Sequence, residues 1–107
     1  MKTKIEEFRN ITEQMEDTYA RKNHDYGDSF AKARKTIQNY TLGKLYDKMS
    51  RLITLMQSGE AAQVHEESIE DTLLDMANYA VMEILERRRD FEAKQMELHQ
   101  LPHKGDF

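Results

Sequence analysis

Apolar residues recur along most of the chain at alternating steps of three and four, the spacing of one face of an α-helix. A capping box at Thr3 and Glu6, a capping hydroxyl at Thr41 and a terminating glycine at Gly59 mark helix ends. Turn-forming residues separate the first two periodic stretches. The pattern predicts an all-α protein with helices over about residues 3–22, 30–39, 41–58 and 67–91 or beyond.

Two of these helices carry a continuous apolar stripe that we expect to form the core. The stripes are Leu42, Leu45, Met49, Leu52 and Met56 on the third helix, and Ile69, Leu73, Met76, Ala80 and Ile84 on the last. The last helix is also apolar on a second side, at Leu74, Val81, Met82 and Leu85. A lone chain would expose that side as a patch unusual for a soluble monomer, so we expect an obligate oligomer.

The composition favours long helices in one small domain over residues 1–107, with a peripheral tail at 98–107. The chain has four glycines and one proline, and 38% of its residues are hydrophobic while 34% are charged. A domain of this size buries a modest fraction of its surface, which again favours oligomerisation. The chain has no cysteine, which excludes disulfides and zinc sites built from thiolates.

Charge and hydropathy restrict the location and the partners. No apolar run approaches the roughly 20 residues that span a membrane, and the N-terminal segment is charged rather than apolar. We therefore expect a cytoplasmic protein without membrane partners. The net charge is −4, and the basic run Arg87–Arg89 is bracketed by acidic residues at helical spacing. We expect no nucleic-acid partner, because nucleic-acid-binding proteins usually carry a basic excess on one face.

Charged residues on the last two helices form the main candidate site. At about 100° per residue, Glu67, Asp71, Asp75 and Asn78 share a narrow arc whose neighbours are apolar. Carboxylates in such a setting are costly unless they pair with cations or bind a metal. The preceding helix offers Lys44, Asp47, Lys48 and Arg51 on one face. These cations could neutralise the acids or hold a phosphate. An ordinary ion-pair network between helices is the alternative.

The segment between the first two helices is the second candidate. It runs over residues 22–28, where Gly27 permits a tight bend and Tyr26 could stack on a base. The alternative is a turn that only joins two helices, with Tyr26 covering the core.

Three segments together resemble the nucleotide-modification-associated domain family, which is found largely in phages and bacteria. These are Lys22–Phe30, Leu45–Leu52 and Glu67–Ala80, within a resemblance that covers about residues 20–85. The family is similar to the all-α nucleotide pyrophosphohydrolases of the MazG and dimeric dUTPase type. The resemblance implies a MazG-like helical bundle completed by oligomerisation as a dimer or tetramer, located in the host cytoplasm if the protein is phage-encoded.

The resemblance also implies a site. In MazG-type enzymes, E-x-x-E and E-x-x-D pairs on successive helices bind Mg²⁺, which activates water beside a triphosphate. The D-(x)6-N spacing places Asp71 and Asn78 on the enzymes' Asp and Asn. The first acidic pair falls near Lys48 and Arg51, where Asp47 is the only acid.

Three functions follow from these observations. The first is a Mg²⁺-dependent nucleoside triphosphate pyrophosphohydrolase, with Asp47, Glu67, Asp71 and Asp75 as metal ligands and the last three also catalytic. Its nucleotide contacts would be Lys22, Asp25, Tyr26, Lys48, Arg51 and Asn78. The second is a non-catalytic protein that sequesters or senses a nucleotide, such as a signalling nucleotide, favoured by the cations at positions 48 and 51. The third is a purely structural helical module.

Overall fold

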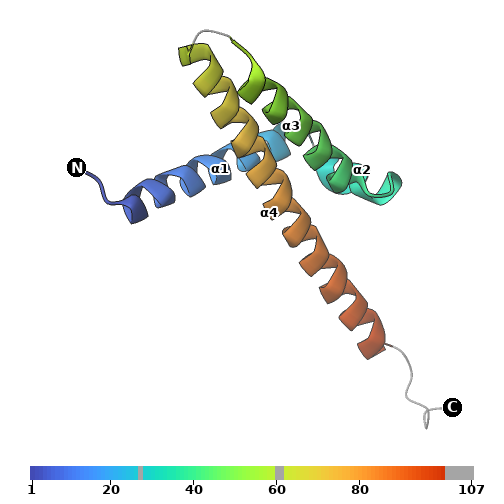
Figure 1. Cartoon of the computed structure of the whole chain (residues 1–107). Coiled ribbons are helices and arrows are strands. Elements are labelled where there is room, and N and C mark those ends of the chain that lie inside the picture. The colour runs from blue at the N-terminus through green and yellow to red at the C-terminus, as the bar shows by residue number, and fades with distance from the viewer. Residues whose placement is uncertain (27, 60–61, 101–107) are drawn as a thin grey trace, which may run out of the picture.

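The computed structural model describes residues 1–26, 28–59 and 62–100. Its helices are α1 (Lys4–Tyr26), α2 (Ser29–Thr36), α3 (Tyr40–Gln57) and α4 (Ala62–Gln100), and these described residues include no strand (Figure 1). The all-α prediction is confirmed. Residues 101–107 of the predicted tail and Gly27 lie outside the described residues.

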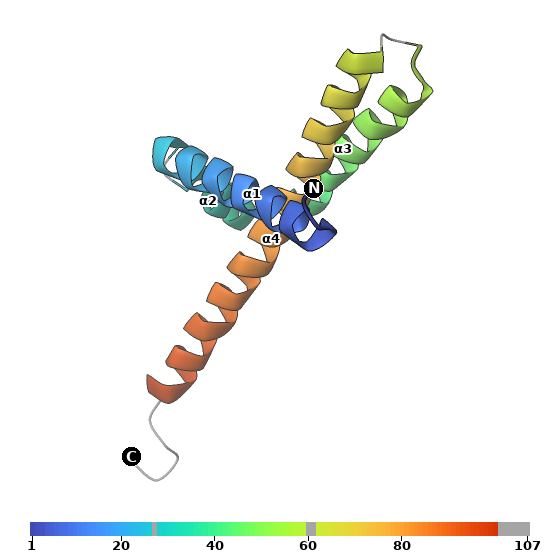
Figure 2. The ribbon, with the colours of Figure 1, turned by 90° about the vertical axis from the view of Figure 1, so that its left-hand side faces the viewer.

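The helices form an elongated arrangement, 71 Å along its longest axis. Figures 1 and 2 show α3 running alongside the first half of α4, with α1 crossing the middle of α4 and α2 near the start of α3. The first turns of α1 and the second half of α4 extend away from the other helices. All four helices therefore approach one another only around the middle of α4.

Two helices are longer than their sequence pattern predicts. α1 continues to Tyr26, so most of the segment expected to be a turn is helical, and the chain turns at Asp28 in the left-handed conformation (φ 59°). Residues 23–26 include no glycine or proline, and nothing in them stops the backbone hydrogen bonding of a helix. α4 begins at Ala62 rather than near Glu67, because residues 62–66 include no glycine or proline that would prevent a helical turn.

The connection between α2 and α3 also differs from the prediction. α2 ends at Thr36 because Ile37 is extended (φ −109°, ψ 116°), and Asn39 turns the chain in the left-handed conformation (φ 57°). Thr41 is therefore not the capping residue but lies inside α3. Its buried hydroxyl donates a hydrogen bond of 2.6 Å to Oε1 of Glu83 on α4.

The contact between α3 and α4 mixes apolar and polar side chains. Leu52 and Leu55 are the buried hydrophobic residues of the described chain, and Thr72 on α4 is 1% exposed. The Thr72 hydroxyl donates to the carbonyl oxygen of Ser68 at 2.7 Å, which satisfies it within its own helix. Further along the same contact, Lys48 and Asp75 form an ion pair of 2.9 Å.

The two apolar stripes predicted as the core are only partly buried in the single chain: the expectation is confirmed for Leu52, which is buried, and was wrong for most of the other positions. Leu42, Met49 and Met56 are 46–66% exposed, and Leu73 and Ile84 are about half exposed. Periodicity identifies an apolar face but not the surface that covers it. Within the chain, α3 and α4 meet through the neighbouring faces, which carry the threonines and the ion pair.

The second apolar side of α4 is partly covered, contrary to the expectation of an open patch. Leu74, Met82 and Leu85 are half-buried, and Val81 is exposed. Met82 lines a cavity together with residues of α1, which crosses this side of α4. No helix in the described part of the chain is both long and apolar enough to cross a membrane.

Candidate functional site

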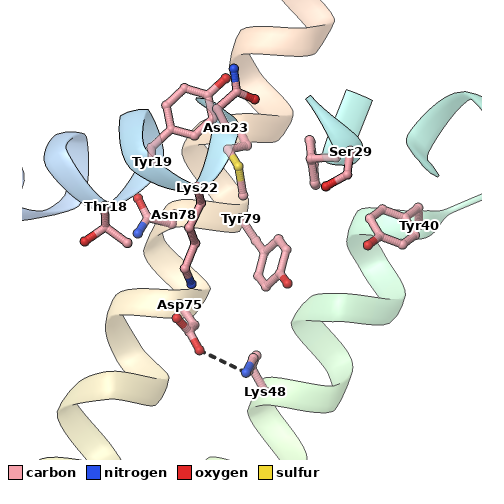
Figure 3. Close-up of a pocket in the computed structure, with 12 residues that line it drawn as sticks. Thr18, Tyr19, Lys22, Asn23, Ser29, Tyr40, Lys48, Asp75, Asn78 and Tyr79 are labelled. Atoms are coloured by element: carbon pink, nitrogen blue, oxygen red, sulfur yellow. Dashed lines mark ion pairs between the residues drawn. The ribbon is translucent and has the colours of Figure 1, made fainter. Parts of the chain in front are cut away.

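All four helices contribute to a cavity of about 270 Å³ beside the middle of α4 (Figure 3). It is lined by Thr18, Tyr19, Lys22 and Asn23 of α1, Ser29 and Phe30 of α2, Tyr40 and Lys48 of α3, and Asp75, Asn78, Tyr79 and Met82 of α4. The four α4 residues recur at steps of three, one and three, so they share one helix face. The cavity approaches the lower end of the size range of small-molecule sites.

One end of the cavity is charged. Nζ of Lys48 lies 2.9 Å from Oδ2 of Asp75, and both side chains remain partly accessible, at 28% and 39%. Figure 3 shows Lys22 extending from α1 toward Asp75. Two ammonium groups thus face one carboxylate, which leaves a net positive charge at a solvent-accessible site. Such a site attracts an anion.

The opposite wall is aromatic. Phe30 packs against Tyr40 and Tyr79 with ring centroids 5.7 and 6.1 Å apart. Nζ of Lys44 lies 5.4 Å from the centroid of the Tyr40 ring, which supports that ring by a cation–π contact. Tyr19 completes the wall from α1. Aromatic rings of this kind offer flat apolar surface together with hydroxyl groups that can hydrogen-bond.

The Tyr19 phenol is held in its neutral form. Burial raises its pKa, and the negative charges of Asp28 and Glu86 raise it further, while Arg89 acts in the opposite direction. A neutral phenol can donate a hydrogen bond to an anion or to a carbonyl oxygen. The side-chain amide of Asn78, half-buried at the same cavity, can both donate and accept.

The structure brings together four of the residues proposed from the sequence: Lys22, Lys48, Asp75 and Asn78. Others lie elsewhere. Asp25 and Arg51 are exposed and do not line the cavity, and Asp25 contacts its neighbour His24 at 3.4 Å. The side chain of Tyr26 lies outside the described residues.

The remaining predicted acids are also separate from the cavity. Asp71, expected to be buried, is exposed, and so is Glu67. Both lie nearer the start of α4, whereas α1 crosses α4 further along, so α1 does not cover them. Asp47 is exposed beside a shallow hollow between α2 and α3 that Ile37 and Tyr46 also line.

Among the described residues of one chain, the four acids proposed as magnesium ligands do not form one metal site. Within the described residues, no three histidine, aspartate or glutamate side chains come together in a way that could hold a metal ion. Asp75, the acid at the cavity, has Lys48 as its partner. The magnesium site formed by Asp47, Glu67, Asp71 and Asp75 therefore stays a prediction.

A second charged cluster fixes the helices around the cavity. Glu83 accepts hydrogen bonds from Nε and Nη2 of Arg34 at 2.9 and 3.0 Å, from the Thr41 hydroxyl and from Nε of Arg87 at 2.7 Å. Nη1 of Arg34 also reaches Asp90 at 2.7 Å. Hydrogen bonds from Arg34, and then from Thr41 and Arg87, outweigh desolvation and lower the pKa of Glu83 to about 2. The same contacts raise the pKa of Arg34.

This cluster positions the aromatic wall. Arg34 lies one turn after Phe30 on α2, and Thr41 follows Tyr40 on α3, so bonding both to Glu83 holds the two rings against α4. The helical spacing of basic and acidic residues around position 87 predicted the pair of Arg87 with Glu83. Sequence reasoning missed Arg34, because Arg34 and Glu83 are 49 residues apart and no local spacing relates them.

Sequence reasoning also missed the aromatic residues of the cavity. No functional role was predicted from the sequence for any of the four, Tyr19, Phe30, Tyr40 and Tyr79. One signal was present for Tyr79, which follows Asn78 and lies one helical turn after Asp75. Nothing local indicated that Tyr40 would face the same cavity.

A family of known proteins matches this part of the chain. The model of the family described as nucleotide modification associated domain 1 matches residues 22–86, which include most of the cavity. No curated protein and no solved structure matches the chain.

Proposed function

Because the chain belongs to the nucleotide modification associated domain 1 family, we propose that its central cavity binds a phosphorylated nucleotide. One observation carries the proposal: two lysine ammonium groups and a wall of aromatic rings line the same cavity. A nucleotide has a phosphate at one end and a flat base at the other. The cavity offers complementary chemistry at its two ends.

The phosphate would bind at Lys22 and Lys48. Ammonium groups bind phosphate oxygens through charge-assisted hydrogen bonds. Lys48 is bonded to Asp75 at 2.9 Å, so an incoming phosphate competes with that carboxylate for the same ammonium. Lys22, which forms no ion pair within the described residues, supplies positive charge without such competition.

The base would lie against the aromatic wall. Tyr79 and Tyr40 offer ring faces, and base–aromatic stacking tolerates any base. Asn78 is the side chain suited to reading a base edge or a sugar hydroxyl, because its amide presents both donor and acceptor groups.

Mg²⁺-dependent hydrolysis of a nucleoside triphosphate is a second candidate. The spacing of Glu67, Asp71 and Asp75 at successive turns of α4 favours it, because acids four residues apart share one helix face. The Lys48–Asp75 pair favours binding without hydrolysis, because it occupies the carboxylate nearest the cavity.

Calorimetric titration of a nucleotide panel, in Mg²⁺ and in chelator, tests both candidates. We expect nucleotides to bind at least tenfold more tightly than the matching nucleosides, and Lys22→Ala to weaken nucleotide binding about tenfold. Arg21→Ala is the matched control, since Arg21 is the adjacent exposed cation and does not line the cavity.

The outcomes separate the two functions. Binding that persists in chelator, with no product after long incubation in Mg²⁺, supports a binding protein. Product formed only with Mg²⁺ supports the hydrolase. Absence of binding by every nucleotide in both buffers overturns the proposal.

A further inference from the structure

The hairpin formed by α3 and α4 is covered on one side only. α1 crosses it on the side of Asn78 and Met82. On the other side, the residues that follow the contact positions are open: Met49 follows Lys48, and Leu73 follows Thr72. Each is turned by about 100° in the same sense from its neighbour. Because α3 and α4 are antiparallel, Met49 and Leu73, with the apolar residues in line with them, lie on the same side of the hairpin.

We call this surface the bare face. It consists of Leu42, Tyr46, Met49, Ile53 and Met56 of α3 and Ile69, Leu73, Met76, Ala80 and Ile84 of α4. The five α3 residues are 46–73% exposed. The charged residues of α3 lie on its opposite half, at Lys44, Asp47, Lys48 and Arg51. On α4, Leu73 and Ile84 are about half exposed, and Ile69 and Met76 are half-buried. The bare face is thus formed by apolar side chains of two adjacent helices.

The described residues of a single chain bury little apolar surface. Leu52 and Leu55 are the buried hydrophobic residues in the described part of the chain. Stable interfaces bury about 800 Å² per partner over roughly 20–30 residues, with an apolar centre and a polar rim. The ten side chains of the bare face would form the apolar centre of such an interface.

We propose that the bare face packs against the bare face of a second copy of this chain, giving a four-helix bundle. The α4 stripe favours a second copy because it is symmetric about the midpoint between Met76 and Ala77. Ile69 and Ile84 are equally distant from this point, and so are Leu73 and Ala80. In a two-fold interface with antiparallel α4 helices, residues related in this way face one another.

Charge supports the same pairing. Glu66 and Arg87 are also equally distant from the midpoint, and both are exposed. In the antiparallel pair, Glu66 would face Arg87 of the partner subunit at each end of the apolar stripe. Opposite charges then meet twice, which fixes the register of the two copies.

This interface differs from the one that the sequence suggested. The side of Leu74, Met82 and Leu85 is half-buried in the single chain. The α4 stripe predicted as part of the intrachain core, and three of the five positions of the α3 stripe, supply the interface instead. The inference is independent of the proposed nucleotide binding, because the cavity opens between α1 and the other side of the hairpin.

Light scattering on a charged variant tests the face. The wild-type protein should have a mass of twice 12.7 kDa at micromolar concentration. Ile53→Glu places a charge in the bare face and should give monomers or unfolded chains. Met96→Glu, at a residue 62% exposed on the free end of α4, is the control and should leave the mass unchanged. A wild-type mass of 12.7 kDa overturns the proposal.

A cysteine probe tests the pairing without relying on a destabilised variant. The chain has no native cysteine, so Ala77→Cys introduces a single thiol next to the midpoint. Mild oxidation should give a disulfide-linked dimer for Ala77→Cys and not for Met96→Cys. Equal cross-linking of the two variants, or none at position 77, overturns the antiparallel pairing.

Discussion

Replacing Glu83 by glutamine should destabilise the protein more than any comparable change at an exposed glutamate. The carboxylate of Glu83 joins three helices, because it accepts hydrogen bonds from Arg34 on α2, Thr41 on α3 and Arg87 on α4 itself. Glutamine keeps the shape of the side chain but removes its charge. Arg34 would then retain Asp90 as its only charged partner among these contacts.

The magnitude follows from the shift in pKa. The pKa of Glu83 is lowered from 4.5 to about 2, and one unit corresponds to about 1.4 kcal/mol. The side chain is 20% exposed, so solvent screens part of the interaction. We expect the free energy of unfolding to fall by about 2–3 kcal/mol at pH 7.

The pH dependence gives an independent check. A carboxylate whose pKa is lowered on folding stabilises the folded state above its ordinary pKa of about 4.5. This stabilisation is lost as the pH falls through about 2. The difference in stability between the wild type and Glu83→Gln should therefore shrink between pH 4.5 and pH 2.

Urea unfolding at one fixed protein concentration, followed by circular dichroism, measures both effects. Glu92→Gln is the matched control, since Glu92 is an exposed glutamate further along α4 with no ion pair in the described structure. Equal stability of Glu83→Gln and wild type at pH 7 would refute the reasoning.

Three further substitutions have defined outcomes. Gly43→Ala should stabilise the protein by about 0.5–1 kcal/mol in thermal unfolding, because Gly43 lies inside α3 and an added Cβ meets nothing within 4 Å; a lower melting temperature would contradict this. Asp71→Asn should change the unfolding free energy by less than about 0.5 kcal/mol, because the side chain is exposed. A loss of several kcal/mol would instead support the buried ion pair that the sequence predicted. Asp75→Asn should raise nucleotide affinity several-fold in calorimetry by freeing Lys48, whereas unchanged or weaker binding would show that Lys48 does not contact the phosphate.

The sequence was sufficient to predict the approximate positions of the helices and four of the residues that line the cavity. Spacing of apolar residues located all four helices, although α1 and α4 extend further than predicted. Lys22, Lys48, Asp75 and Asn78 were identified because they lie in the segments that resemble a family or at helical spacing within them. Their meeting in one cavity follows from the way α1 crosses the hairpin.

The core positions and the ion pairs that the sequence did not predict depend on which helix faces pack together. Leu42 and Met49 were assigned to the core because periodicity shows that a face is apolar, yet the intrachain contact of α3 is centred on the neighbouring face with Lys48 and Leu55. Arg34 and Glu83 could not be paired from the sequence, because ion pairs between distant residues leave no local pattern.

The polar contacts between α3 and α4 have a consequence for the uniqueness of the fold. Apolar side chains, methionines above all, pack almost equally well if one helix slides along another by a turn. The pairs Thr41–Glu83 and Lys48–Asp75 do not tolerate such a slide, because a displacement of about 5.4 Å would separate all four groups. Lys48 and Asp75 would then each lose a charged partner, and the buried Thr41 hydroxyl would lose its acceptor. The two polar pairs thus select the single alignment of α3 and α4 in which the cavity exists.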